Sequence, residues 1–203
     1  MHAVIFDIDG TLLQSAEVDD ILYRNSVRAV LGDIAFRPSL ADYDRVTDSG
    51  VLSQIFDDND IPESPQHVAA IKSAFVEAFR SHFRRSGVFP EIPGAKALLE
   101  TISKSKSYSA AIATGGWRET AVLKLESAGF DLARLPLASS DDSSERSEIM
   151  RLALSKLDND FESVTYYGDG PWDRDACRVL GWRFVPVGPV LGGIESYIGL
   201  SIA

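Results

Sequence analysis

The chain has 203 residues, 45% hydrophobic and 25% charged, which is ordinary for a folded protein with one sizeable core. Thirty acidic against twenty basic residues give a net charge of −10, so non-specific nucleic-acid binding is not expected. No apolar run approaches the roughly 18–20 residues that span a bilayer, and the first residues lack a signal-peptide pattern. Because Cys177 is the single cysteine, no internal disulfide can form, and a reducing cytoplasm is the expected location.

Short apolar runs alternate with helical patterns along most of the chain. The first run, Ala3–Phe6, ends abruptly at Asp7, as expected for a buried parallel strand. Similar runs lie at 110–113, 164–167 and 184–187, and helices are predicted at 119–128, 145–157 and 173–180. This alternation predicts an α/β fold in which helices cover both faces of a parallel sheet.

The stretch from about Gln14 to Glu91 has no convincing strand. Ser15 is expected to cap a helix with apolar positions at Val18, Ile21, Leu22, Ala29 and Val30. Further helices are predicted at about 51–56 and 66–84, and a linker rich in proline and glycine follows at 90–94. We therefore expect a core made of residues 1–14 and 92–203, with an all-helical domain inserted at 15–91.

Two carboxylates, Asp7 and Asp9, follow the first predicted strand, and Gly10 and Thr11 come directly after them. Ligand sites in open α/β sheets lie at the carboxyl ends of the strands. Gly10 permits the loop to curl, so that both acids can face one ligand. An acidic turn that merely ends the strand is the alternative, but the complete pattern favours a functional site.

Two more polar turns follow predicted strands. Thr114, Gly115 and Gly116 could present a hydroxyl and backbone N–H groups to an oxyanion, although such turns are also common as plain structure. Asp169 and Asp173 could hold a divalent metal, and oxygen ligands suit magnesium. Asp173 could instead cap the following helix, or do both.

These three turns, in this order and each at a strand end, resemble motifs one, two and four of the haloacid dehalogenase superfamily. The resemblance runs from Val4 to about Val187 and implies a Rossmann-like core. The helical insertion resembles the cap of the β-phosphoglucomutase and phosphoglycolate phosphatase-like branch. The implied activity is Mg²⁺-dependent hydrolysis of a small phosphomonoester.

The resemblance also implies a role for each matching residue. Asp7 would attack phosphorus to form an aspartyl-phosphate, while Asp9 would protonate the leaving oxygen and then activate water. Thr114 and the amide of Gly115 would bind phosphoryl oxygens. The implied magnesium ligands are Asp7, Asp9 (through its backbone carbonyl), Asp169 and Asp173. Because dehalogenating relatives lack the second acid, Asp9 favours a phosphate ester as substrate.

The third motif of the family, a lysine before a helix, has no direct match. Ser144 stands where the lysine is expected, and Arg146 is the nearest cation, so we assign Arg146 the role of bracing Asp7. A solvated surface arginine is the alternative, and Lys156 is a second candidate further along the helix. Arginine would supply the charge with a different fork geometry.

The inserted helices are expected to close over the core and exclude water. Asn25 interrupts the apolar stripe of the first helix, so it is either a buried amide or a substrate contact. Thr47, Asp48 and Ser49 precede the second helix, and Asp48 or Ser49 is expected to cap it. The same segment could face a polar substrate.

Two other functions stay open: a phosphosugar mutase with the same chemistry, and a binding or regulatory relative without turnover. The missing lysine supports the second of these, whereas the presence of all four core acids argues against it. The expected partner is a small phosphorylated metabolite, with no nucleic acid and no membrane, and the chain is expected to be a monomer or a homodimer. The sequence does not choose a substrate.

Overall fold

A computed structural model describes residues 1–200. Five parallel strands form one sheet in the order β3-β2-β1-β4-β5. Their bounds are His2–Phe6 (β1), Tyr108–Ala113 (β2), Leu137–Ala138 (β3), Ser163–Gly168 (β4) and Arg183–Pro186 (β5). The predicted α/β parallel sheet is confirmed. The sequence did not reveal β3, because a strand of two residues is too short to show a period.

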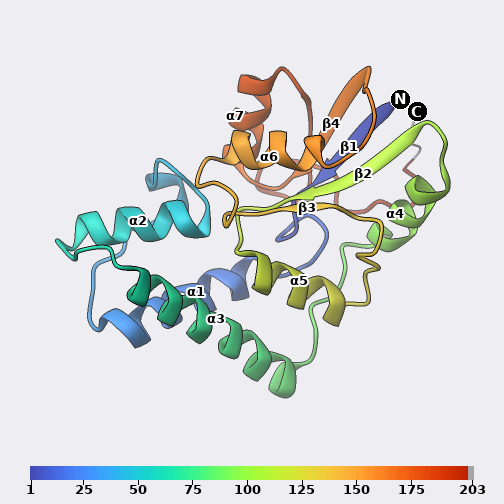
Figure 1. Ribbon diagram of the computed structural model, residues 1–203. Coiled ribbons are helices and arrows are strands. Elements are labelled where there is room, and N and C mark those ends of the chain that lie inside the picture. The colour runs from blue at the N-terminus through green and yellow to red at the C-terminus, as the bar shows by residue number, and fades with distance from the viewer. Residues whose placement is uncertain (201–203) are drawn as a thin grey trace.

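Helices cover both faces of the sheet (Figure 1). One face carries α4 (Ala95–Lys104) and α5 (Arg118–Ser127), and the other carries α6 (Arg146–Ser155) and α7 (Pro171–Leu180). Alternate residues of β1 enter the two layers, since Phe6 belongs to the larger apolar core and Ile5 to the smaller one. Both faces of β1 are therefore buried, which explains its unbroken apolar run.

The strand register brings the predicted turns to one edge of the sheet. Phe6 pairs with Ile112 on β2 and with Tyr167 on β4. Because all strands run in the same direction, the residues that follow them share the carboxyl edge. Asp7 is fixed there by its backbone N–H, which donates to the carbonyl of Tyr167 at 3.0 Å.

Three longer helices and a short 3-10 helix lie between β1 and α4: α1 (Ala16–Leu31), η1 (Leu40–Asp42), α2 (Asp48–Asp58) and α3 (Pro65–Ser86). They form a group beside α5, and α1 packs along α3 (Figure 1). Tyr23 and Val27 are the buried apolar residues of α1, whereas Ile21 is 50% exposed. The predicted stripe of α1 was therefore wrong at Ile21 and also at Ala29, which is exposed. In the part of the chain described, we find no helix with the length and hydropathy needed to cross a bilayer.

The helical segment enters and leaves the core at one place. The backbone N–H of Gln14 donates to the carbonyl of Pro90 at 2.9 Å, and that of Ile92 donates to the carbonyl of Leu12 at 2.9 Å. An antiparallel bridge between Leu13 and Glu91 lies between these bonds. Residues 12–14 and 90–92 therefore form a paired neck.

Candidate active site

A cleft of about 640 Å³, part of it open to solvent, lies at the carboxyl edge of the sheet. From the core it is lined by Asp7, Asp9, Thr114, Gly115, Arg146 and Asp169. From the helical segment it is lined by residues of α1, the start of α2 and the chain before α2. The structure thus brings most of the predicted core residues together in one cleft.

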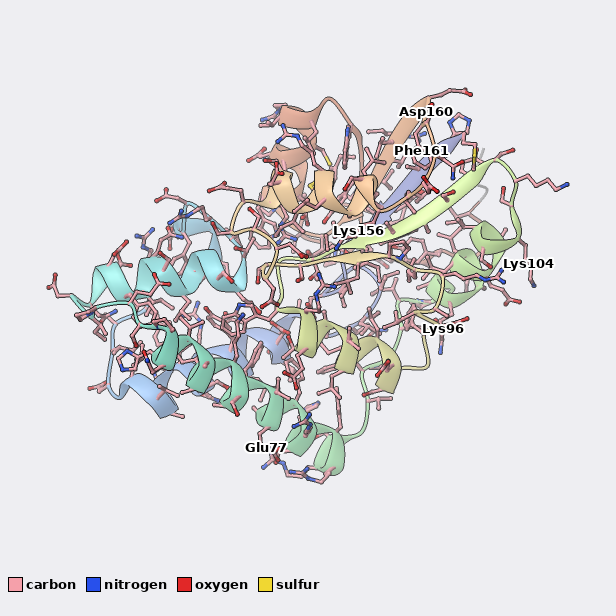
Figure 2. The ribbon with its side chains drawn as sticks, viewed as in Figure 1. Glu77, Lys96, Lys104, Lys156, Asp160 and Phe161 are labelled. Atoms are coloured by element: carbon pink, nitrogen blue, oxygen red, sulfur yellow. The ribbon has the colours of Figure 1, made fainter. Side chains whose placement is uncertain are left out.

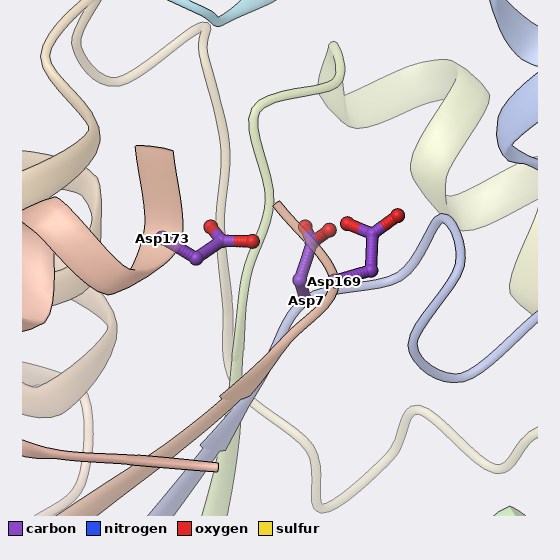
Figure 3. Close-up of side chains that lie close together, drawn as sticks. All are labelled: Asp7, Asp169 and Asp173. Atoms are coloured by element: carbon purple, nitrogen blue, oxygen red, sulfur yellow. The ribbon is translucent and has the colours of Figure 1, made fainter. Parts of the chain in front are cut away.

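Three carboxylates meet beside this cleft, as Figure 3 shows. One oxygen each of Asp7, Asp169 and Asp173 lies within 4.8 Å of the others. Such an all-oxygen cluster suits a hard divalent cation. Asp173 also accepts a hydrogen bond from the backbone N–H of Gly170 at 3.2 Å, so it helps to order the start of α7 as well. The side chain of Asp9 lies outside the cluster, which leaves its backbone carbonyl as the predicted ligand.

Burial and mutual repulsion make the ionised cluster unfavourable without a cation. Burial raises the pKa of Asp7 well above its usual value, Arg146 opposes this, and Asp173, Asp169 and Asp9 raise it further. Burial, followed by Asp173 and Asp9, raises the pKa of Asp169 to about 7. A bound divalent cation would oppose each of these effects, so the donor set fits a metal ion.

Gly10 permits a close approach inside the site. Its φ of +73° is one that other L-residues rarely adopt, and a Cβ there would lie 2.2 Å from Oδ2 of Asp169. The loop that carries Asp7 and Asp9 can therefore bend against Asp169 only with glycine at this position.

Arg146 lies against the carboxylate cluster, not on the solvated surface. Its Nη1 is 3.4 Å from Oδ1 of Asp7 and 3.4 Å from Oδ1 of Asp173, and its side chain is 11% exposed. Nη2 donates to the carbonyl of Val46 at 3.1 Å. A Cβ at position 115 would come within 2.6 Å of Nη2, so Gly115 leaves room for the guanidinium. The sequence-based alternative of a surface arginine is wrong, while the role of Arg146 in catalysis stays a prediction.

Lys156, the other candidate for the missing lysine, lies elsewhere. Its Nζ donates to the carbonyl of Leu137 at 2.7 Å, at β3 (Figure 2). It does not line the cleft. Thr114, in contrast, is buried at the cleft wall, where its Oγ1 accepts a hydrogen bond from the N–H of Gly116 at 3.1 Å.

The segment before α2 is tied to the core turns. Thr47, and not Asp48 or Ser49 as predicted, caps α2: it has extended backbone, and its Oγ1 accepts from the N–H of Gly50 at 3.0 Å. The same hydroxyl donates to the carbonyl of Ser144 at 2.9 Å, and Ser49 donates to the carbonyl of Ser140 at 2.9 Å. Thr47 and Asp48 line the cleft, but Ser49 does not.

The expectation for Asn25 was wrong in both of its forms. Asn25 is exposed on α1, so it is neither a buried amide nor a residue of the cleft. The inward position belongs to Tyr23, whose hydroxyl donates to the carbonyl of Asp48 at 2.7 Å. Since each helical residue turns by about 100°, two positions are enough to move a side chain from one face to the other.

The sequence also concealed the partners of Asp9. Ser15 stands at the start of α1, but its hydroxyl donates to Oδ1 of Asp9 at 2.5 Å and makes no capping bond. Lys124 on α5 donates to both oxygens of Asp9, at 2.7 and 2.6 Å, and to Asp19 on α1 at 2.5 Å. No local pattern pairs residues that lie 115 and 105 positions apart.

Comparison with known protein families identifies the class of protein to which this fold and cleft belong. The family model of the haloacid dehalogenase-like hydrolases matches residues 1–181, so the chain belongs to this family and is a hydrolase of that type. None of the curated proteins matches the chain.

Several solved structures share the fold. A hydrolase from Pseudomonas syringae is 21% identical, with a TM-score of 0.71 over 92% of this chain and 84% of that one. CbbY from Rhodobacter sphaeroides in complex with phosphate is 22% identical, with a TM-score of 0.72 over 98% and 96% of the two chains. A variant of CbbY in complex with xylulose-(1,5)bisphosphate is 21% identical, with the same TM-score and coverage.

Proposed function

We propose that the protein is a magnesium-dependent phosphohydrolase that cleaves a small phosphomonoester through an aspartyl-phosphate on Asp7. The observation that carries this proposal is the arrangement around Asp7. Its carboxylate lies at the end of the central strand, within 4.8 Å of ligand oxygens from Asp169 and Asp173, with Arg146 3.4 Å away. A nucleophile and the means to neutralise an anionic substrate are thereby combined in one cleft.

Asp7, Asp169 and Asp173, together with the backbone carbonyl of Asp9, would hold the magnesium ion. The ion would neutralise charge that the nucleophile and the phosphate bring into the same space. Thr114 and the N–H of Gly115 would orient the phosphoryl oxygens, and Arg146 would share the remaining negative charge.

In the first step, an oxygen of Asp7 forms a bond to phosphorus while the ester P–O bond breaks, and Asp9 gives its proton to the departing oxygen. In the second step, Asp9 takes a proton from water as the water oxygen attacks phosphorus. The bond between Asp7 and phosphorus then breaks and inorganic phosphate is released. Asp9 is suited to both steps because it lines the cleft near Asp7 without belonging to the carboxylate cluster.

We propose that residues 15–91 act as a cap domain and residues 1–14 and 92–203 as the catalytic core. The paired neck at 12–14 and 90–92 supports these boundaries, since both crossings lie at one place. The bonds from Thr47 and Ser49 to the core turns support a closed position of the cap over the cleft.

The cap side of the cleft suggests which leaving group fits. Asp19, Asp20 and Asp48 line it. Asp19 is paired with Lys124 and Asp20 with Arg24, whereas the side chain of Asp48 has no cation partner among the described residues and accepts from the backbone N–H of Trp117 at 2.8 Å. A second anionic group on the substrate would meet these carboxylates. A neutral, hydroxylated or amine-bearing leaving group is therefore favoured over a carboxylate.

A panel of phosphate esters with and without Mg²⁺ tests this function. We expect steady, Mg²⁺-dependent release of phosphate from p-nitrophenyl phosphate and from at least one sugar or polyol phosphate. Asp7→Asn should abolish it while the fold persists. If no ester in a broad panel is hydrolysed, or if Asp7→Asn keeps the activity, the proposal is wrong. Interconversion of sugar phosphate isomers on addition of a sugar bisphosphate would favour the mutase instead.

A further inference from the structure

Lys124 is a fully buried cation that the proposed mechanism does not use. It lies on α5, its side chain is 0% exposed, and its Nζ is 5.2 Å from the centre of the Phe79 ring. Burying an ammonium group is costly unless its donors are paired. Lysine carries three N–H donors, and Lys124 has three short contacts, two to Asp9 and one to Asp19.

The carboxylate of Asp9 is held at both oxygens. Lys124 contacts Oδ1 at 2.7 Å and Oδ2 at 2.6 Å, and the hydroxyl of Ser15 contacts Oδ1 at 2.5 Å. A carboxylate held by two side chains from different elements has little freedom to rotate, and these three contacts leave one of its about four acceptor positions free for the proton that the proposed first step requires. These donors therefore set where the oxygens of Asp9 lie relative to Asp7 and to the cleft.

The same ammonium links the core to the helical segment. Asp9 belongs to the loop after β1, Asp19 belongs to the first part of α1, and Lys124 contacts both. One cation thus serves two carboxylates, which leaves an excess of negative charge at the cleft that both acids line. If Lys124 served only to hold α1 against α5, the ion pair with Asp19 would be sufficient. The two contacts with Asp9 therefore indicate a further role.

We propose that Lys124 is a positioning residue, which fixes the orientation of the Asp9 carboxyl group when α1 is packed against the core. The inference rests on the proposed function, in which Asp9 protonates the leaving oxygen. Lys124 does not touch the reacting atoms in this account. It acts by fixing the direction of the Asp9 carboxyl group.

The test compares leaving groups that differ in their need for a proton. p-Nitrophenolate departs as a stable anion, whereas the alkoxide of glycerol 2-phosphate must be protonated as it leaves. The quantity to measure is the ratio of kcat/KM for glycerol 2-phosphate to that for p-nitrophenyl phosphate. Because kcat/KM covers only the steps up to departure of the leaving group, the second role of Asp9 does not enter. Both values come from one preparation, so any misfolded fraction cancels.

In Lys124→Met we expect this ratio to fall by about 10²-fold, the usual contribution of a positioned general acid. Asp9→Asn should lower it at least as much. Lys96→Met is the matched control: it makes the same substitution at a lysine whose Nζ lies 5.8 Å from the centre of the Phe130 ring and which does not line the cleft, so the ratio should stay within about threefold of wild type. Lys124→Arg should restore part of the loss, because it returns N–H donors to Asp9 with different geometry.

Lys124→Met leaves two partly buried carboxylates without their cation and can therefore lower stability. The double variant Lys124→Met with Asp19→Asn removes one of these charges and should show the same fall in the ratio. A ratio within about threefold of wild type in both variants, in an enzyme that releases phosphate with Mg²⁺, would overturn the inference and leave the proposed function standing. No turnover by the wild type, or an unchanged ratio in Asp9→Asn, would overturn both.

Discussion

Arg146→Met removes the guanidinium that contacts both Asp7 and Asp173 but keeps much of the side-chain volume. At the observed 3.4 Å, one charge pair with an effective dielectric constant near 20 corresponds to about 5 kcal/mol, an upper limit because a bound metal would share the same charges. Loss of a preorganised donor to a developing anion typically lowers the rate by about 10²–10³-fold. We expect a fall of that size in kcat/KM for p-nitrophenyl phosphate.

The affinity for metal should change in the opposite direction. Arg146 places a positive charge beside two of the three clustered carboxylates, so its removal should make Mg²⁺ bind more tightly in Arg146→Met. Titration of activity with Mg²⁺ and calorimetry of metal binding measure the two effects separately. A loss of fold alone would weaken both activity and binding, and therefore cannot imitate this result.

Two further variants complete the comparison. Arg146→Lys should recover part of the activity, because lysine returns the charge without the second arm that reaches Val46. Gly115→Ala should displace Arg146, since the new Cβ would lie 2.6 Å from Nη2. Activity in Arg146→Met within about threefold of wild type would refute the reasoning that this arginine stabilises the transition state.

Other outcomes follow from the same cleft. The pKa of Asp169 is about 7 in the folded protein against 3.8 ordinarily, so between these values the folded state holds a proton that the unfolded state has lost. Without metal, the free energy of unfolding should therefore fall as pH rises from about 4 to about 7, which denaturant titrations measure. The slope should be flatter in Asp169→Asn. Mg²⁺ at 100 times its Kd should raise the free energy of unfolding by about 2.7 kcal/mol, which corresponds to a rise of about 5–10 °C in Tm. The rise in Tm should be larger at pH 8 than at pH 5, and equal rises at the two pH values would contradict a carboxylate site. Thr114→Val should raise KM by about tenfold with the fold intact, by loss of one hydrogen bond to the phosphoryl group. Asp48→Asn should improve kcat/KM for esters with a carboxylate on the leaving group relative to neutral ones, and an unchanged preference would exclude Asp48 from substrate selection.

The arrangement at the carboxyl edge of the sheet was predictable because its signals are local. An apolar run followed at once by Asp7 marks both a strand and its end, and the same is true of the runs before Thr114 and Asp169. The parallel register of β1 with β2 and β4 then places the three turns together. Arg146 is the cation nearest to the vacant third-motif position in the sequence, and its placement against Asp7 agrees with the predicted role.

What the sequence concealed depends on contacts between distant segments. Lys124 stands in a short helix that shows no apolar face, and only the folded chain brings it to Asp9. The prediction for Asn25 failed because it assumed which face of α1 points inward. The residues packed against α1 determine that face, and the sequence of the helix alone does not. The strand β3 and the helix α4 were missed because the first is very short and the second follows a proline-rich turn without a capping side chain.

The paired neck also bears on how such a chain can be divided. Because Leu13 and Glu91 face each other across a β-bridge, the two ends of the helical segment lie next to each other. Joining residues 12–14 directly to residues 90–92 with a short turn would give a shorter protein in which β1 keeps its neighbours β2 and β4. Such a truncated chain would lack the helical residues that line the cleft, so its carboxylate cluster would be open to bulk water and to larger phosphorylated molecules. The choice of substrate would then be separable from the chemistry by a single deletion.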